Sequence, residues 1–174
     1  MRMQEILENQ PEVTKKWFLE NWKEEKFIIH YLNAIEDGFK FVNGLLIKFP
    51  FDEELLDKIE STYAEIIFMR HSDLHVHPNM YEAISVIGGN GQYIKVPAQS
   101  SVDYLVENLY PGKQFGVEPG TVHAFLTDLD SPLKIKVITD KIYTEKEEIT
   151  RMPFFTLDKI LKENPDLLNI SITI

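Results

Sequence analysis

Three histidines and one glutamate are the residues whose types and spacing in this sequence could hold a metal ion. His75 and His77 stand one residue apart in the segment HVHPNMYE. Residues i and i+2 of a β-strand project from the same face, so the two imidazoles would lie side by side. Pro78–Asn79 can begin a turn, after which Glu82 opens a strand that would pair beside the histidines. His123 follows a Pro–Gly turn in the segment EPGTVH.

The chemistry of these side chains predicts which ions they would bind. Imidazole nitrogens and a carboxylate suit borderline divalent ions such as iron, manganese, nickel, cobalt or zinc. We therefore predict a metal site made of His75, His77, Glu82 and His123. An octahedral ion held by these ligands would keep open positions for water, oxygen or a bidentate substrate. The chain has no cysteine, which excludes disulfides, thiolate ligands and a cysteine nucleophile.

The same residues resemble the two sequence motifs of the cupin superfamily. The first motif, G-x5-H-x-H-x3,4-E-x6-G, is matched at His75, His77, Glu82 and Gly89, with Met69 in place of the leading glycine. The second, G-x5-P-x-G-x2-H-x3-N, is matched at Gly112, Gly120 and His123, with Glu118 and Thr127 in place of the proline and asparagine. The ligand positions are kept, and the departures fall on turn and structural positions. The resemblance covers the stretch from Tyr63 to Tyr143.

The elements that must position these residues are expected to be short strands. From Tyr63 onward, apolar runs alternate with glycine and proline turns, which indicates a sandwich or barrel and not βαβ units. The predicted strands are 63–71, 80–87, 91–96, 102–110, 113–117, 123–127 and 133–143. We interpret Gly88 through Gly91 as a hairpin turn. With the resemblance, this predicts a mainly β fold whose cupin core, at residues 63–150, is a β-barrel of the double-stranded β-helix or jelly-roll type.

Extensions flank the predicted barrel within what we expect to be one domain. Residues 1–62 would form a helical and β-hairpin extension packed on the barrel, and 151–174 a C-terminal helical tail. The predicted elements are a helix at 12–25, a hairpin at 38–51 around Asn43–Gly44, a helix at 53–62 capped by Asp52, and a helix between Thr156 and Pro165. The first helix carries Val13, Trp17, Phe18 and Trp22 at helical spacing, and such stripes usually bury in a core.

Composition and charge limit the partners. The net charge of −10 and the lack of a basic stripe argue against nucleic-acid binding. No stretch approaches the roughly 18 apolar residues that span a bilayer, and the N-terminus has no apolar signal region, so we expect a cytoplasmic protein without membrane contact. Cupins are commonly dimers, and the stripe of Trp17, Phe18 and Trp22, with Phe154–Phe155, offers apolar surface. We therefore expect a homodimer.

The resemblance permits three functions for a site that binds a small-molecule substrate. The neutral field of three histidines resembles the iron and nickel oxygenases of the superfamily, so it favours iron and dioxygenase-type chemistry. A sugar-phosphate or keto-acid isomerase using zinc or manganese is the second possibility, and it would need cations among Arg70, Lys95 and Lys113. The third is a metal-bearing binding module without turnover. Fold alone selects none of them and identifies no catalytic residue.

Four further residues have side chains that could take part in chemistry. His71 lies an even number of residues before His75, but a solvated histidine at the barrel rim is the favoured interpretation because Ser72–Asp73 can break the strand. We interpret His30 as structural or exposed. Tyr81 and Tyr93 could hydrogen-bond substrate, although strand tyrosines usually pack.

Overall fold

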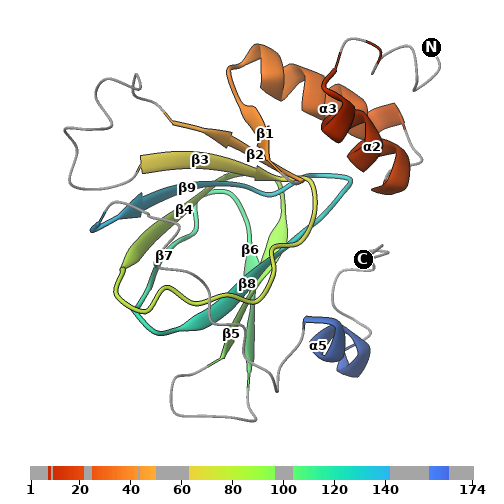
Figure 1. Ribbon diagram of the computed structural model, residues 1–174. Coiled ribbons are helices and arrows are strands. Elements are labelled where there is room, and N and C mark those ends of the chain that lie inside the picture. The colour runs from red at the N-terminus through yellow and green to blue at the C-terminus, as the bar shows by residue number, and fades with distance from the viewer. Residues whose placement is uncertain are drawn as a thin grey trace.

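The computed structural model describes residues 8, 10–21, 25–42, 44–49, 63–96, 104–141 and 157–164. In this part of the chain two antiparallel sheets face each other (Figure 1). The larger sheet has the strand order β1-β2-β3-β9-β4-β7, and the smaller has the order β6-β5-β8. The strands are β1 (Lys40–Val42), β2 (Leu45–Lys48), β3 (Tyr63–Phe68), β4 (Glu82–Gly88), β5 (Gly91–Val96), β6 (Leu105–Leu109), β7 (Gln114–Val117), β8 (Val122–Thr127) and β9 (Lys134–Thr139).

The predicted mainly β fold is confirmed, and each strand predicted from Tyr63 onward has a counterpart among β3 to β9. The predicted hairpin is also present, because β1 pairs with β2 and Val42 lies opposite Leu45. The interpretation of Gly88 through Gly91 as a hairpin turn is wrong. β4 pairs with β7 and β9, whereas β5 pairs with β6 and β8, so this turn carries the chain from one sheet to the other.

The helices differ from the prediction near the N-terminus. The expected helix over residues 12–25 ends early, as α2 (Glu12–Asn21), and a further helix, α3 (Glu25–Glu36), follows it. The missed helix does carry a helical signal, since Ile28, Tyr31 and Ala34 recur at the right spacing and are all buried. The predicted C-terminal helix is present as α5 (Leu157–Glu163).

Some predictions fall outside the described residues. They concern Trp22, Phe154–Phe155, the helix at 53–62 and the cap and stop residues Thr156 and Pro165. Among the helices that the structure describes, none is both long and apolar enough to cross a bilayer.

Because side chains alternate between the two faces of a strand, neighbouring residues of one strand pack in different hydrophobic clusters. In the pairing of β2 with β3, Leu45 opposes Phe68 and Leu46 opposes Ile67. Leu45 and Phe68 face the space between the two sheets, whereas Leu46 and Ile67 face outward. The core between the sheets is formed by Phe68, Ile84, Val86, Tyr93, Leu109, Val117, Phe125, Leu133, Ile135 and Val137. This core fixes the distance between the strands that carry the candidate ligands.

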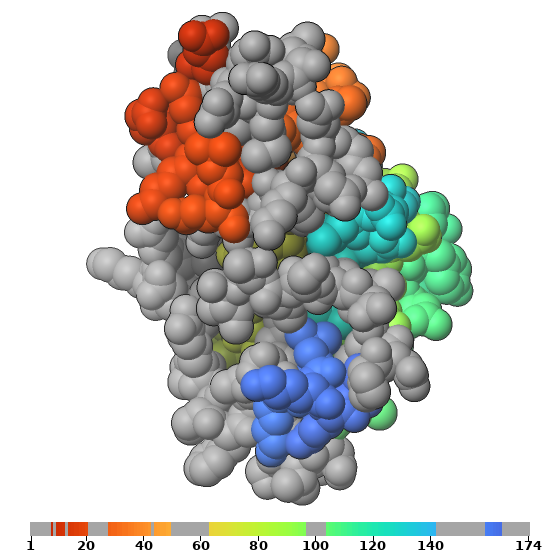
Figure 2. Space-filling model, turned by 90° about the vertical axis from the view of Figure 1, so that its right-hand side faces the viewer, coloured from red at the N-terminus to blue at the C-terminus, as the bar shows by residue number. Residues whose placement is uncertain are grey.

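Helices cover the outer faces of the sheets. α2 and α3 pack Phe18, Ile28 and Tyr31 on Leu46 and Met69, which lie on the outer side of the larger sheet. α5 packs Ile160 on the outer face of the smaller sheet, against a cluster that contains Ile94, Val96, Val122, Ala124 and Leu126. Figure 2 shows α2 and α5 at opposite ends of the molecule. The helices therefore support both sheets from outside and leave the interior to the strands.

Candidate metal centre

The segment that carries His75 and His77 runs antiparallel to β8. The backbone N–H of His75 donates to the carbonyl of His123 (2.9 Å), and the N–H of His123 donates to the carbonyl of His75 (2.8 Å). The N–H of Gly120 donates in turn to the carbonyl of His77 (2.9 Å). The prediction of a regular strand here is wrong, because β3 ends at Phe68 and the segment has only an isolated bridge at His75.

Side chains explain why the segment does not continue as a strand. The Ser72 hydroxyl accepts a hydrogen bond from the N–H of Phe125 (2.7 Å), and His71 Nδ1 accepts one from the N–H of Thr127 (3.0 Å). These two side-chain atoms accept hydrogen bonds from backbone N–H groups of β8. In a regular strand beside β8, backbone carbonyls would accept those hydrogen bonds. The ladder is restored at His75, so this residue is still held opposite His123.

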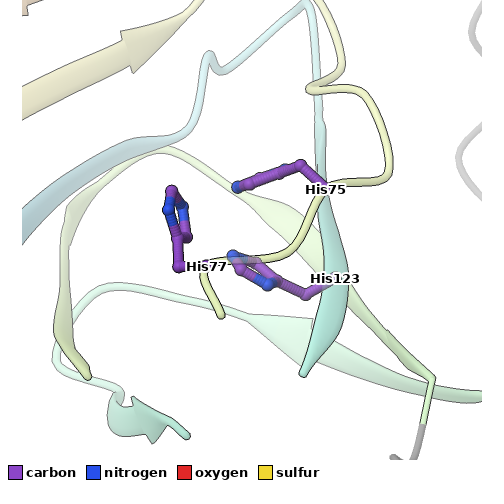
Figure 3. Close-up of side chains that lie close together, drawn as sticks. All are labelled: His75, His77 and His123. Carbon is purple, nitrogen blue, oxygen red and sulfur yellow. The ribbon is translucent and has the colours of Figure 1, made fainter. Parts of the chain in front are cut away.

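The bridge brings the three imidazoles together. Directly opposite residues of an antiparallel pair project from the same face, and the ring centroids of His75 and His123 are 4.2 Å apart. The ring of His77 lies 5.1 Å from that of His75 and 5.8 Å from that of His123. The candidate ligand atoms of the three rings all lie within 4.8 Å of one another, and the rings face a common space (Figure 3).

Glu82 reaches this space from the other sheet. β4 begins at Glu82, as expected, but it pairs with β7 and β9 and not with the histidine segment. The expectation that Glu82 lies on a strand paired beside the histidines is therefore wrong. Its carboxylate oxygens lie 3.6 Å from His77 Nε2 and 3.2 Å from His123 Nε2. All four predicted ligands are thus close together, although they come from both sheets.

Backbone carbonyls set the orientation of two of the rings. His75 Nδ1 lies 2.8 Å from the carbonyl oxygen of Asp73, and His123 Nδ1 lies 2.9 Å from that of Thr121. A carbonyl can only accept, so each Nδ1 carries the hydrogen and each Nε2 of the neutral ring presents a lone pair. This arrangement fixes the tautomer that a metal-binding histidine needs.

The structure also leaves two acceptors facing each other inside the protein. His123 Nε2 and the Glu82 oxygen nearest to it are both buried, and neither has a hydrogen-bond partner among the described residues. When His123 is neutral its hydrogen lies on Nδ1, and both atoms then carry lone pairs at a separation of 3.2 Å. A cation between them removes the repulsion. These residues therefore fit a divalent metal, and their atom types suit the borderline ions.

Burial keeps at least one ring in the form that binds metal. Burial lowers the pKa of His75 to about 3, and the neighbouring His123 adds to the effect. The neutral ring therefore predominates at physiological pH, and protons compete weakly for its nitrogen.

The structure contradicts the favoured interpretation of His71. Its side chain is buried and bonded to β8, and is not solvated at the rim. Burial, followed by the charge of Arg70, lowers the pKa of His71 to about 4. His71 is therefore a neutral structural histidine beside the centre. His30 is exposed on α3, as expected.

The two candidate tyrosines lie in different places. Tyr81 packs over Gly116, on the outer side of β7. Tyr93 is buried between the sheets, with its ring 4.8 Å from Phe115, 5.5 Å from Phe125 and 5.9 Å from His123. Its hydroxyl is buried and has no hydrogen-bond partner among the described residues. Burial and the negative charge of Glu82 raise the pKa of Tyr93, so the hydroxyl keeps its proton.

The three cations considered for substrate binding are also separated. Arg70 donates to the carbonyl of His71 (2.7 Å), and its side chain lies over Gly44 beside Trp17, on the outer side of the larger sheet. Lys113 forms an ion pair with Glu107 at 3.0 Å. Lys95 lies opposite His123 in the pairing of β5 with β8 and so shares its face.

Sequence reasoning missed the groups that orient the rings. The carbonyls of Asp73 and Thr121 belong to the backbone, so no residue type signals them. Phe115 and Phe125, which pack around Tyr93 beside the centre, appear in the sequence only as part of an alternating apolar pattern. Any core strand shows this pattern, so it did not indicate a site.

Comparisons with known proteins identify the fold. No protein-family model matches the chain, and no curated protein does. Among solved structures, oxalate decarboxylase from Lactobacillus farciminis, in a formate complex, is 15% identical with a TM-score of 0.53, over 74% of this chain and 38% of that one. The capsular polysaccharide assembling protein CapF from Staphylococcus aureus is 10% identical with a TM-score of 0.54, over 67% of this chain and 31% of that one.

A further oxalate decarboxylase structure is 18% identical with a TM-score of 0.51, over 63% of this chain and 29% of that one. The chain thus spans between 29% and 38% of the length of these proteins. At this identity the likeness concerns the fold, and the fold is that of the cupin superfamily.

Proposed function

We propose that this cupin-fold chain is a metal-dependent enzyme acting on a small organic molecule. The metal ligands are His75, His77, Glu82 and His123, and the reaction is of the dioxygenase type with iron as the ion. The support for the metal is the pair of buried atoms, His123 Nε2 and a Glu82 carboxylate oxygen, which lie 3.2 Å apart and have no hydrogen-bond partner among the described residues. The support for the reaction type is the donor set, in which three imidazole rings are joined by a single carboxylate.

Residues around the proposed centre orient the histidine rings and shield one side of the site from water. Asp73 and Thr121 hold two rings with Nε2 toward the common space. Tyr93, Phe115 and Phe125 form an aromatic wall on one side of His123, which excludes water from that side. His75 keeps part of its surface exposed, although it is buried enough to lower its pKa, so the centre approaches solvent at this residue. A bound divalent ion would supply Lewis acidity and, if it is iron, one-electron chemistry.

The isomerase alternative receives less support from the described residues. A sugar phosphate carries a double negative charge and usually needs several cations. Of the three candidates, Arg70 lies on the outer side and Lys113 is paired with Glu107. Only Lys95 shares the face of His123.

Metal analysis tests the proposal. Protein purified without added ions should contain about one equivalent of a divalent transition metal, and iron would favour the oxygenase. His75→Gln should lower the metal content severalfold, whereas His30→Gln, on the exposed side of α3, should leave it unchanged. Oxygen consumption with candidate substrates then separates an oxygenase from an isomerase or a binding module. Protein that contains no metal and takes up none of iron, manganese, nickel, cobalt or zinc would contradict the proposal.

A further inference from the structure

We propose that Tyr93 and Lys95, on the interior side of β5, bind the carboxylate group of a small organic acid next to the metal. This inference rests on the proposed metal centre and specifies its substrate class. In the pairing of β5 with β8, Lys95 lies opposite His123, and Tyr93 lies opposite Phe125. Opposite residues of an antiparallel pair share a face and have Cβ atoms about 5 Å apart. Both side chains of β5 therefore start on the face that carries the metal ligand.

The Tyr93 hydroxyl is the first sign of a ligand. It is buried, its ring is packed by Phe115 and Phe125, and no described residue accepts or donates a hydrogen bond to it. A buried hydroxyl without a partner destabilises the fold, and phenylalanine would fill the same space without that cost. A bound molecule that accepts its hydrogen bond would account for the hydroxyl.

Lys95 is the second sign. It is partly buried, and the described part of the chain gives it no carboxylate partner at ion-pair distance. Lys113, by contrast, is neutralised by Glu107. A loaded centre of one divalent ion and one glutamate keeps a net positive charge. A second positive charge from Lys95 beside it calls for an anionic ligand.

The number of groups favours a carboxylate over a phosphate. One ammonium and one hydroxyl match the single charge and two oxygens of a carboxylate. A phosphate dianion would need further donors, and of the other two candidate cations Arg70 lies on the outer side and Lys113 is paired with Glu107.

Binding of simple anions to the metal-loaded protein tests the inference. Cobalt-loaded protein would be titrated with acetate, with the neutral isostere acetamide and with inorganic phosphate, by calorimetry and by the cobalt absorption spectrum. Acetate should bind more tightly than either competitor. Lys95→Met should weaken acetate binding about tenfold and leave acetamide unchanged, because a charge-assisted hydrogen bond is lost.

Matched variants separate this role from packing and from overall charge. Tyr93→Phe should weaken acetate binding about threefold and should not lower the stability of the metal-free protein, since its hydroxyl has no protein partner to lose. Lys136→Met, which removes the same charge from the outer side of β9, should leave acetate binding unchanged.

The outcomes distinguish this inference from the proposed function. Variants that keep wild-type cobalt content but bind acetate as tightly as wild type would overturn the role of β5 and leave the metal centre intact. Phosphate binding tighter than acetate binding would overturn the carboxylate assignment. Wild-type protein that takes up no cobalt, under conditions where other divalent ions also fail to bind, would overturn both.

Discussion

At the residue scale, the contact between Glu82 and His123 should make the stability of the protein depend on whether the proposed centre holds a metal ion. When His123 is neutral, its Nε2 and the nearby Glu82 oxygen are both acceptors, and they repel each other if no cation lies between them. A divalent ion bound as proposed would replace this repulsion by two attractive contacts, so the free energy of metal binding would be linked to the free energy of folding at this pair.

Glu82→Gln tests this linkage. The glutamine amide can donate a hydrogen bond to His123 Nε2, so the metal-free variant should be about 1 kcal/mol more stable than metal-free wild type. Metal should stabilise wild type by about 2.7 kcal/mol at 100 times its dissociation constant, and should stabilise the variant far less. Urea denaturation with and without a chelator measures both quantities. A metal-free variant less stable than wild type would mean that Glu82 and His123 share a proton in the absence of metal.

The lowered pKa of His71 makes the free energy of unfolding depend on pH. Its pKa is lowered from 6.5 to about 4 in the folded protein, so the unfolded chain binds the proton first as pH falls. Stability is therefore fully present above pH 6.5 and is lost as pH falls from 6.5 toward 4. The loss from this residue should reach about 2 kcal/mol at pH 4.5.

His71→Asn isolates this contribution. Asparagine keeps an acceptor for the N–H of Thr127 but does not titrate. Metal-free wild type should lose about 2 kcal/mol more than the variant between pH 7 and pH 4.5, measured by urea denaturation. Parallel pH profiles of the two proteins would show that His71 is not held neutral by the fold.

At the scale of elements, the turn between β4 and β5 places the two halves of the centre. It sends Glu82 to one sheet and Tyr93 and Lys95 to the other. Gly89 makes the turn possible, because its φ is +67° and a Cβ there would collide with the Pro132 carbonyl. Only glycine satisfies both conditions.

Gly89→Ala should therefore be costly. Left-handed backbone strain alone costs about 1–2 kcal/mol for a non-glycine residue, and the collision with backbone should add to it. Gly112→Ala is the matched control, because Gly112 has a φ of +96° but no atom lies within 4 Å of its Cβ position. We expect Gly89→Ala to lose more stability than Gly112→Ala in urea denaturation. Equal losses would mean that Pro132 moves aside at little cost.

The same turn shows what the sequence could reveal. Alternation and glycine or proline turns located the strands, since both follow from local backbone chemistry. They could not tell a hairpin from a link between sheets, because pairing depends on partners far along the chain. The four candidate ligands could be singled out because their types and spacing suit the chemistry of metals, and the structure brings them close together. The irregular path of residues 71–77 was only hinted at by Ser72–Asp73, since it depends on the donors of β8.

At the scale of the whole molecule, the aromatic residues of α2 pack against other parts of the same chain. Phe18 is fully buried, and its ring lies 4.8 Å from Tyr31 and 5.5 Å from Phe41. Trp17 packs on the same cluster. The expectation that this stripe packs in a core is correct for Trp17 and Phe18, so these two residues no longer provide an argument for a partner subunit.

The homodimer remains a prediction. We expect its interface to lie on the outward sides of α2 and α3. Leu19 is 50% exposed on α2 and Ile29 is 55% exposed on α3. Closed two-fold dimers commonly bury such apolar residues. We expect the full chain to be a dimer by light scattering, and Leu19→Lys combined with Ile29→Lys to produce a monomer with an unchanged melting temperature. Ile138→Lys, at an exposed apolar position on the outer side of β9, should leave the dimer intact. A monomeric wild type, or a dimer that survives the double substitution, would show that these helices serve only their own barrel.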